Sequence, residues 1–317
     1  TALPNTAQDL STVLRSAIMH YVSAPAERRA LLDALPEVDK SARAKMREIA
    51  KAKESTTFAD VVKAEFDGLN GSISQATRDE LYAVVDKIPA AFNKVNAIFA
   101  AKEKKSVGDG GVFMITVSDL CKGCAACVEV CGDHDALRMM PETDELNAEH
   151  LSQMAFLNTL PDTPQRYLGL YDENAPLDSK EAALRNHLMV RRNYDGLASG
   201  DGACAGCGEK SVLRAVASVT EAYMRPLFHA KADRLRATGN PILIGRIADL
   251  RDLQRQVMLE FSEGEGSGFG DITPGAIVVA EDLTPSTFVD LCALAPAGIC
   301  LAAGGTTSHV AIMARAR

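Results

Sequence analysis

The first hundred or so residues place apolar side chains on a helical period. One such stripe follows a candidate N-cap at Asn5 and consists of Leu10, Val13, Leu14, Ile18 and Tyr21. Thr77-Arg-Asp-Glu80 has the sequence of a capping box, and a second apolar stripe runs on from Leu81 to Ile88. No cluster of reactive side chains accompanies these stripes. Residues 1–107 are therefore predicted to be a helical insertion or docking region.

Gly108-Asp-Gly-Gly111 ends this helical pattern, and residues 112–117 favour a β-strand. Further helices are expected over residues 147–160, 181–190, 210–236 with an interruption at Pro226, and 247–261, which is amphipathic. Residues 277–280 and 299–302 are typical of short buried strands, and a helix is expected to start near His309. Together these elements predict a multidomain α/β (α+β) protein.

Composition narrows the function class. The 317 residues are 47% hydrophobic and 24% charged, as in ordinary globular proteins, and their number suits two or three domains. A net charge of −8 and the absence of Trp argue against a nucleic-acid partner.

The cellular location of the protein is predicted from its apolar runs and from its N-terminal residues. We expect no membrane span and no signal peptide, and hence a cytoplasmic protein. Because the sequence starts without Met and ends within a helical pattern, we also expect it to be a fragment of a longer protein.

A first cysteine group has the spacing C-x2-C-x2-C-x3-C and consists of Cys121, Cys124, Cys127 and Cys131. Thiolates are soft ligands that suit iron and sulfide, and Gly123 with two alanines keeps the loop free of bulky side chains. The spacing is that of bacterial ferredoxins, with Gly132 where Pro is usual, and predicts a 4Fe-4S cluster. A zinc site is the alternative.

A second group, Cys204 and Cys207, lies in a Gly-rich turn before the helix that starts near Lys210. A lone CxxC is ambiguous between half a zinc site, half a cluster site and a redox dithiol. The run Gly-Ala-Cys204-Ala-Gly-Cys207-Gly-Glu209, downstream of a ferredoxin quartet, resembles the pyruvate:ferredoxin (2-oxoacid:acceptor) oxidoreductases. The resemblance covers residues 110–236 or so, and residues 1–105 resemble an insertion in the long form of that family, which extends it over about 1–236.

That resemblance implies a ferredoxin-like module followed by the start of a thiamine diphosphate domain. It makes Cys204 and Cys207 two of the four ligands of a second cluster. It also implies oxidative decarboxylation of a 2-oxoacid with coenzyme A, with ferredoxin or flavodoxin as electron acceptor and a homo-oligomer at full length. Lys210 stands where the family often has Thr. Gly108-Asp-Gly110 and Gly200-Asp-Gly202 lack the Asn-Asn of a thiamine motif and are predicted to be turns.

A different motif closes the sequence: Gly304-Gly-Thr-Thr-Ser-His309, leading into a helix. Helix amides and hydroxyl groups stabilise anions, and a neutral His is a nucleophile near neutral pH. The run resembles the swivelling phosphohistidine domain of phosphoenolpyruvate-utilising enzymes, most closely enzyme I of the sugar phosphotransferase system, over about residues 240–317. Ile247–Arg251 and Glu281–Ser286 also match. The resemblance implies that His309 carries a phosphoryl group, and that the parent domains use Mg.

Four regions follow from these patterns: a helical insertion (1–107), a ferredoxin-like iron–sulfur region (108–198), the start of a thiamine-diphosphate-type domain (199–238) and a partial swivelling domain (239–317). The main hypothesis is a fragment of a 2-oxoacid:ferredoxin oxidoreductase fused to a partial phosphohistidine domain. The alternatives are a phosphoenolpyruvate-dependent phosphotransferase acting through His309 and a zinc-binding module without catalysis. Cys292 and Cys300 are expected to be buried free thiols.

Overall fold

The computed structural model describes most of the N-terminal half and parts of the rest of the chain. The described residues are 3–68, 73–118, 121, 123–134, 136–191, 193, 208–240, 243, 246–247, 275–280, 283, 285–302 and 309–315. The chain divides into two compact units. The first consists of Thr1–Gly169, Leu188–Tyr194 and Ala198–Ser211, and the second of Leu170–His187, Asp195–Leu197 and Val212–Arg317.

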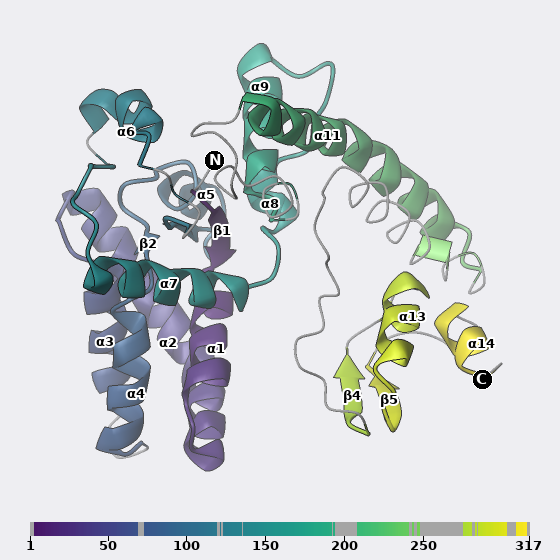
Figure 1. The fold of residues 1–317 in the computed structure, drawn as a ribbon, viewed down its shortest axis with the longest axis horizontal. Helices are drawn as coiled ribbons and strands as arrows, with labels where there is room; N and C mark the ends of the chain where they lie inside the picture. Colours follow the sequence, from purple (N-terminus) through teal and green to yellow (C-terminus); the bar gives the residue numbers. More distant parts are fainter. Residues whose placement is uncertain are drawn as a thin grey trace. The chain divides into compact units, whose positions relative to one another are not determined.

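Four helices form the body of the first unit: α1 (Leu10–Tyr21), α2 (Pro25–Ala52), α3 (Phe58–Asp67) and α4 (Gln75–Val85). Helix α1 contacts α2 and α4, and α3 contacts the same two helices, so the four enclose one core (Figure 1). Leu14, Met46, Phe66 and Leu81 are completely buried in it. The first predicted stripe is confirmed as the inner face of α1, because its Leu and Val side chains are buried.

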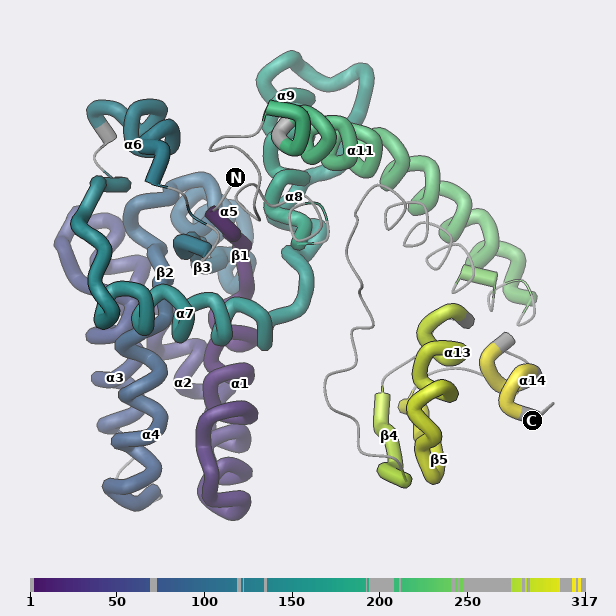
Figure 2. Tube along the Cα trace, in the orientation of Figure 1, coloured from purple at the N-terminus to yellow at the C-terminus, as the bar shows by residue number. Residues whose placement is uncertain are grey.

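A three-stranded antiparallel sheet lies at the end of these helices, in the order β1-β3-β2. Strand β1 is Asn5–Asp9, β2 is Ala90–Ala91 and β3 is Gly111–Ile115 (Figure 2). Asn5 pairs with Ile115 and Asp9 with Gly111. The expected strand at 112–117 is thus confirmed in large part, whereas the helix cap expected at Asn5 is wrong, because that segment pairs with a strand a hundred residues later.

The remaining elements of the first unit are helices, most of them short. Helix α5 (Ala100–Lys105) precedes β3, and α6 (Ala126–Cys131) follows it, with a 3₁₀ turn at Gly132–His134. Helix α7 (Asp144–Asn158) begins at the cap residue Thr143 and buries Phe156 and Leu157 in the main core. Helix α8 (Gln165–Leu168) also belongs to this unit, as do the last two residues of a second 3₁₀ turn (His187–Met189).

The second unit contains α9 (Leu177–Asn186), most of α11 (Gly208–Ala237), β4 (Ile277–Ala280), α13 (Pro285–Ala293), β5 (Gly298–Leu301) and α14 (His309–Arg315). Helix α11 continues through Pro226, where an interruption was expected. Strands β4 and β5 are parallel and α13 lies between them in the chain, which makes a βαβ unit.

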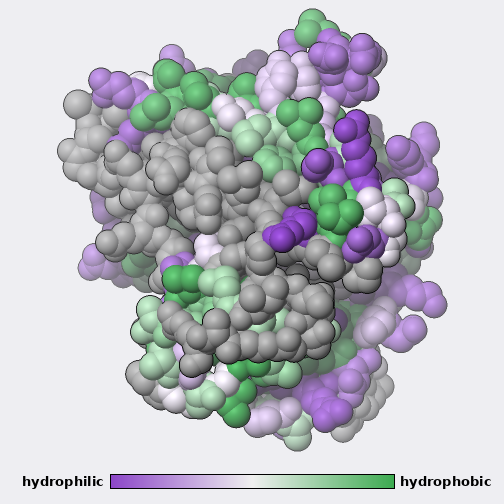
Figure 3. Space-filling view, turned by 90° about the vertical axis from the view of Figure 1, so that its right-hand side faces the viewer, coloured by the Kyte–Doolittle hydropathy of each residue, from purple (hydrophilic) through white to green (hydrophobic). Residues whose placement is uncertain are grey.

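A small core holds this βαβ unit together. It consists of Leu283, Phe288, Leu291 and Val310, with Val278 and Ile299 packed against it. The other face of β4 is open: Ile277 is 71% and Val279 is 74% exposed. Figure 3 shows further apolar residues, in green, at the surface of the molecule.

The described elements are mixed α/β with helices predominating, which agrees with the predicted multidomain α/β class. They do not show a ferredoxin-like or a thiamine diphosphate domain. The region expected to be entirely helical, residues 1–107, contains two of the three strands of the first sheet. Those strands are short and their partner β3 lies outside the region, so local periodicity does not reveal them.

Candidate functional site

The first cysteine group lies on the loop that leads into α6. Cys121 and Cys124 are exposed, and Cys127 and Cys131 are half-buried. The backbone takes the left-handed conformation at Gly123 (φ 63°) and Ala125 (φ 61°), just before α6 begins. A left-handed Ala is strained by its Cβ atom, at a cost of roughly 1–2 kcal/mol. This loop is therefore a sharply turned segment whose thiols are accessible.

Helix α6 places two of the four thiols on one face. Cys127 and Cys131 are one helical turn apart, and the chain turns again at Gly132 (φ 50°). The backbone N–H of Ala136 donates a hydrogen bond to Cys131 Sγ at 3.2 Å. Amide donation to sulfur is one of the contacts that tune iron–sulfur clusters.

The donor set suits iron, but the four sulfurs are not gathered at one point. Among the described residues, no group of three or more His, Cys, Asp or Glu side chains is placed to hold a metal ion. Metal binding and local folding are coupled in small thiolate sites, so the ligands of such a site need not converge beforehand. Ligation of a cluster by Cys121, Cys124, Cys127 and Cys131 stays a prediction.

The second cysteine group, Cys204 and Cys207, lies outside the described residues, as does Gly200-Asp-Gly202. Helix α11 starts at Gly208, directly after this group. The first GDG run is described and is a turn, as predicted. The N–H groups of Gly108 and Gly110 donate to the Glu103 carboxylate at 3.1 and 2.9 Å. Because those amides are already bonded to Glu103, this turn does not fit a diphosphate group.

Glu103 is the centre of a buried polar network that does not correspond to any motif in the sequence. Its side chain is 2% exposed and forms ion pairs with Arg43 at 3.7 Å and Arg47 at 3.2 Å. Arg43 also pairs with Asp39 at 2.9 Å and donates to the carbonyl oxygen of Gly110. The network ties α2 to α5 and to the turn before β3. No local sequence pattern reveals it, because Glu103 and the arginines of α2 are more than fifty positions apart.

His309 is the first residue of α14, and its side chain lies outside the described residues, together with the Gly-rich run 303–308. The next residue, Val310, fixes the start of α14 against the small core. Val310 is 6% exposed and packs with Leu283, Phe288 and Leu291. The candidate phosphoryl carrier therefore follows the βαβ unit and is anchored to its core.

The two remaining cysteines differ from expectation. Cys292 is half-buried, and Cys300 is exposed, so the prediction of a buried thiol is wrong for Cys300. Cys300 pairs in register with Val279 on β4, and successive residues of a strand face opposite sides. It therefore shares the open face of this sheet with the exposed side chain of Val279, while Ile299 packs against the core.

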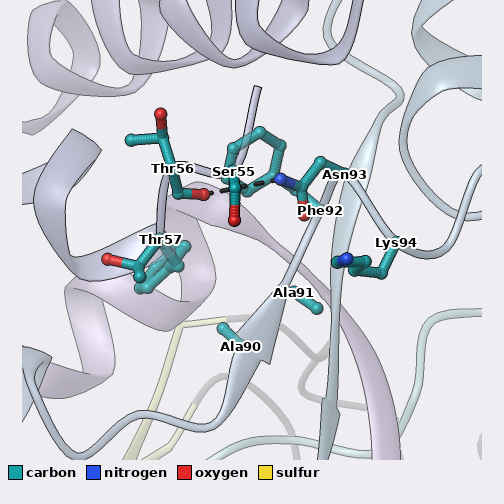
Figure 4. Close-up of a pocket in the computed structure, with 9 residues that line it drawn as sticks. Ser55, Thr56, Thr57, Ala90, Ala91, Phe92, Asn93 and Lys94 are labelled. Atoms are coloured by element: carbon teal, nitrogen blue, oxygen red, sulfur yellow. Dashed lines mark hydrogen bonds between the residues drawn. The ribbon is translucent and has the colours of Figure 1, made fainter. Parts of the chain in front are cut away.

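A hollow of about 190 Å³ lies at the start of α3, between Ser55–Phe58 and Ala90–Lys94 (Figure 4). Asn93 Nδ2 donates to the carbonyl oxygen of Thr56 at 3.4 Å and to that of Glu54 at 3.1 Å. Thr57 forms a capping box with Asp60. These polar groups bond to the protein itself, and no predicted site residue lines the hollow.

Comparison with known proteins finds a family match in the C-terminal segment. Residues 272–317 match the model of the family described as PEP-utilising enzyme, mobile domain. This chain is 42% identical over 86 residues to a multiphosphoryl transfer protein of Xanthomonas campestris, covering 26% of this chain and 10% of that protein. It is 41% identical over 70 residues to a phosphoenolpyruvate-protein phosphotransferase of Haloferax volcanii, covering 22% and 12%.

A longer similarity joins this chain to multiphosphoryl transfer protein 2 of Escherichia coli, at 31% identity over 157 residues, or 44% of this chain and 19% of that protein. The chain thus spans only 10–19% of the length of these three relatives. No solved structure matches.

These matches support the phosphoenolpyruvate-utilising part of the sequence interpretation, and nothing among them supports the pyruvate:ferredoxin oxidoreductase part. The three relatives described above carry names of phosphoryl transfer proteins, and none of the three is named as an oxidoreductase. No helix in the described part of the chain has the length and apolarity needed to cross a membrane.

Proposed function

We propose that the C-terminal part of this chain carries a phosphoryl group on His309, taken from phosphoenolpyruvate and passed to an acceptor. The observation that carries the proposal is the family match over residues 272–317, which includes His309. Two relatives, similar over 86 and 70 residues, are named as a multiphosphoryl transfer protein and a phosphoenolpyruvate-protein phosphotransferase. The fold supports it, because α14 begins at His309 and is fastened to the βαβ core through Val310.

The chemistry requires a neutral imidazole, and an unperturbed His has a pKa of about 6.5. A ring nitrogen of His309 would attack the phosphorus atom of phosphoenolpyruvate. The P–N bond forms as the P–O bond to the enol oxygen breaks, and the released enolpyruvate takes up a proton to become pyruvate. The groups that bind phosphoenolpyruvate are expected on a separate domain, since the chain covers so little of its relatives.

The test is phosphoryl labelling of the full chain. ³²P-phosphoenolpyruvate is added together with Mg²⁺ and the separately expressed phosphoenolpyruvate-binding domain of a phosphotransferase relative. We expect acid-labile, base-stable label on the wild-type chain, loss of label in His309→Ala, and full label in His229→Ala, whose imidazole is on the exposed side of α11. Label that persists in His309→Ala, or a wild-type chain that takes no label, would contradict the proposal.

A second candidate function is electron transfer through a 4Fe-4S cluster on Cys121, Cys124, Cys127 and Cys131. It is favoured by the quartet spacing, by the sharp turns at Gly123 and Ala125, and by the exposure of Cys121 and Cys124. Such a cluster would supply one-electron transfer, and the four cysteines would hold it. The sequence resemblance then implies a 2-oxoacid as the source of electrons and ferredoxin or flavodoxin as the acceptor.

In that resemblance, Cys204 and Cys207 would bind part of a second cluster, and thiamine diphosphate and coenzyme A would belong to the longer protein. The first cluster is tested by measuring iron and acid-labile sulfide per chain after anaerobic purification and reconstitution. We expect about four of each in the wild type and in Cys292→Ala, and a loss of both in Cys124→Ala. Zinc without sulfide would instead favour the zinc-binding module.

A further inference from the structure

A groove of about 380 Å³ lies between α2 and α5 in the first unit. Its lining comes from two short segments: Arg47, Ala50 and Lys51 on α2, and Phe99, Ala100, Glu103 and Lys104 at α5. Small-ligand sites in proteins occupy about 300–1,000 Å³, so the groove has room for a compact organic molecule. None of the residues assigned to phosphoryl transfer or to the cluster lines it.

The groove carries an excess of positive charge. Arg43, Arg47 and Lys51 follow one another at intervals of four along α2 and so lie on one face. The first two share a single carboxylate, that of Glu103. Lys51 lies one turn further on and is exposed, as is Lys104. In the described part of the chain, neither lysine forms an ion pair.

The floor of the groove is apolar. Phe99 is 1% exposed and belongs to the main core, and Ala50 and Ala100 pack against that core while remaining half-buried. Two alanines in place of larger side chains leave the space open above Phe99. The net charge of the chain is −8, so a cationic rim here is a local feature and is not a consequence of overall composition.

We propose that this groove binds a small organic anion. Its carboxylate or phosphate would lie between the ammonium groups of Lys51 and Lys104, and a short apolar or aromatic body would lie on Ala50, Phe99 and Ala100. Glu103 does not repel such an anion strongly, because Arg43 and Arg47 already neutralise its carboxylate. The inference is independent of the function proposed for His309.

The experiment uses the full chain with ¹³C-labelled alanine methyl groups and 1-naphthyl phosphate as the probe. We expect saturable chemical-shift changes at the methyl groups of Ala50 and Ala100. The variant Lys51→Gln/Lys104→Gln should raise Kd about tenfold or more, because it removes both ammonium groups that would bond to the anion. The matched control Lys40→Gln/Lys45→Gln removes two exposed lysines of α2 outside the groove and should leave Kd unchanged.

Two comparison ligands separate the parts of the proposal. Inorganic phosphate and 1-naphthalenemethanol, which each keep one half of the probe, should both bind more weakly than 1-naphthyl phosphate. Equal binding of inorganic phosphate would overturn the role of the apolar floor. The proposal also fails if both double variants bind the probe equally, or if the two alanine methyl resonances do not move. Circular dichroism of each variant confirms that its helices are retained.

Discussion

Glu80 binds Ser23 across the helical body, although the two residues are fifty-seven positions apart. Its carboxylate accepts hydrogen bonds from Ser23 N at 2.9 Å and from Ser23 Oγ at 2.6 Å. A matching contact runs the other way: Glu27 of α2 accepts from Ser74 N at 2.7 Å and Ser74 Oγ at 2.9 Å. Since Ser74 is the N-cap of α4 and Ser23 precedes α2, each helix fixes the start of the other.

The coupling between Glu80 and Ser23 can be measured directly. We expect Glu80→Ala to lower the thermal unfolding midpoint of the chain, and Glu48→Ala, which removes an exposed carboxylate of α2, to leave it nearly unchanged. A double-mutant cycle with Ser23→Ala should return a non-zero coupling energy. Strict additivity of the two single changes would show that the contact has no energetic role.

Acid should weaken the same contacts. The hydroxyl and N–H groups of Ser23 lower the pKa of Glu80 below 4.5, and the N–H of Ser74, with the Thr77 and Ser74 hydroxyls, lowers that of Glu27. A carboxyl whose pKa is lower in the folded state stabilises the fold above its unfolded pKa. Stability should therefore decrease as pH falls below about 4.5, and less steeply in Glu27→Gln/Glu80→Gln. Urea midpoints from pH 6 to pH 3 test this, and parallel curves for both proteins would refute it.

The Glu103 network predicts a larger effect. Glu103→Gln removes the carboxylate shared by Arg43 and Arg47, and the buried guanidinium of Arg43, whose side chain is 7% exposed, keeps only Asp39 of these two carboxylate partners. Loss of one member of a buried charged pair costs roughly 3–5 kcal/mol. Equilibrium urea unfolding measures this cost. Amide hydrogen exchange at Gly108 and Gly110 should also accelerate, because both amides donate to Glu103. Protection unchanged from the wild type would contradict the assigned contacts.

Tyr82 should titrate late. Burial, then the hydrogen bond to Asp67 at 2.6 Å, raises its pKa from 10.0 to about 12. A raised folded pKa contributes stability that is present below the unfolded pKa and is lost as pH rises through the folded one. Stability should thus fall between pH 10 and about 12, and less in Tyr82→Phe. Ultraviolet titration of the phenolate checks the pKa, and a value near 10 would exclude the contact.

The core below His309 can be tested without changing His309 itself. Val310→Asp places a charge in the small core of the second unit, where burial of an unpaired charge is strongly unfavourable. If His309 carries phosphate, we expect this variant to lose most of its labelling, whereas Ala314→Asp, on the exposed side of α14, should retain it. Equal labelling of the two variants would separate phosphoryl transfer from the packing of α14.

The capping box predicted at Thr77–Glu80 does not form, although its residue types are present. Thr77 and Glu80 have the right types and spacing, yet the N-cap of α4 is Ser74, three residues earlier, and the Thr77 N–H donates to Ser74 Oγ at 3.3 Å. Glu80 binds Ser23 instead. A motif defines which groups can cap a helix, and the position of the helix start is chosen by the contacts of the neighbouring helices.

The sequence by itself determined the helical stripes, the spacing of the first cysteine group and the C-terminal phosphohistidine motif, because each depends on residues a few positions apart. Only the tertiary structure decided that Asn5–Asp9 is a strand, that Cys300 is exposed and that Glu103 joins α2 to α5. The ion pair of Glu103 with Arg47 joins residues 56 positions apart, and the strand pair of Asn5 with Ile115 joins residues about 110 positions apart. Helical periodicity is a local property, whereas the choice of a distant partner is made by the packing of the whole unit.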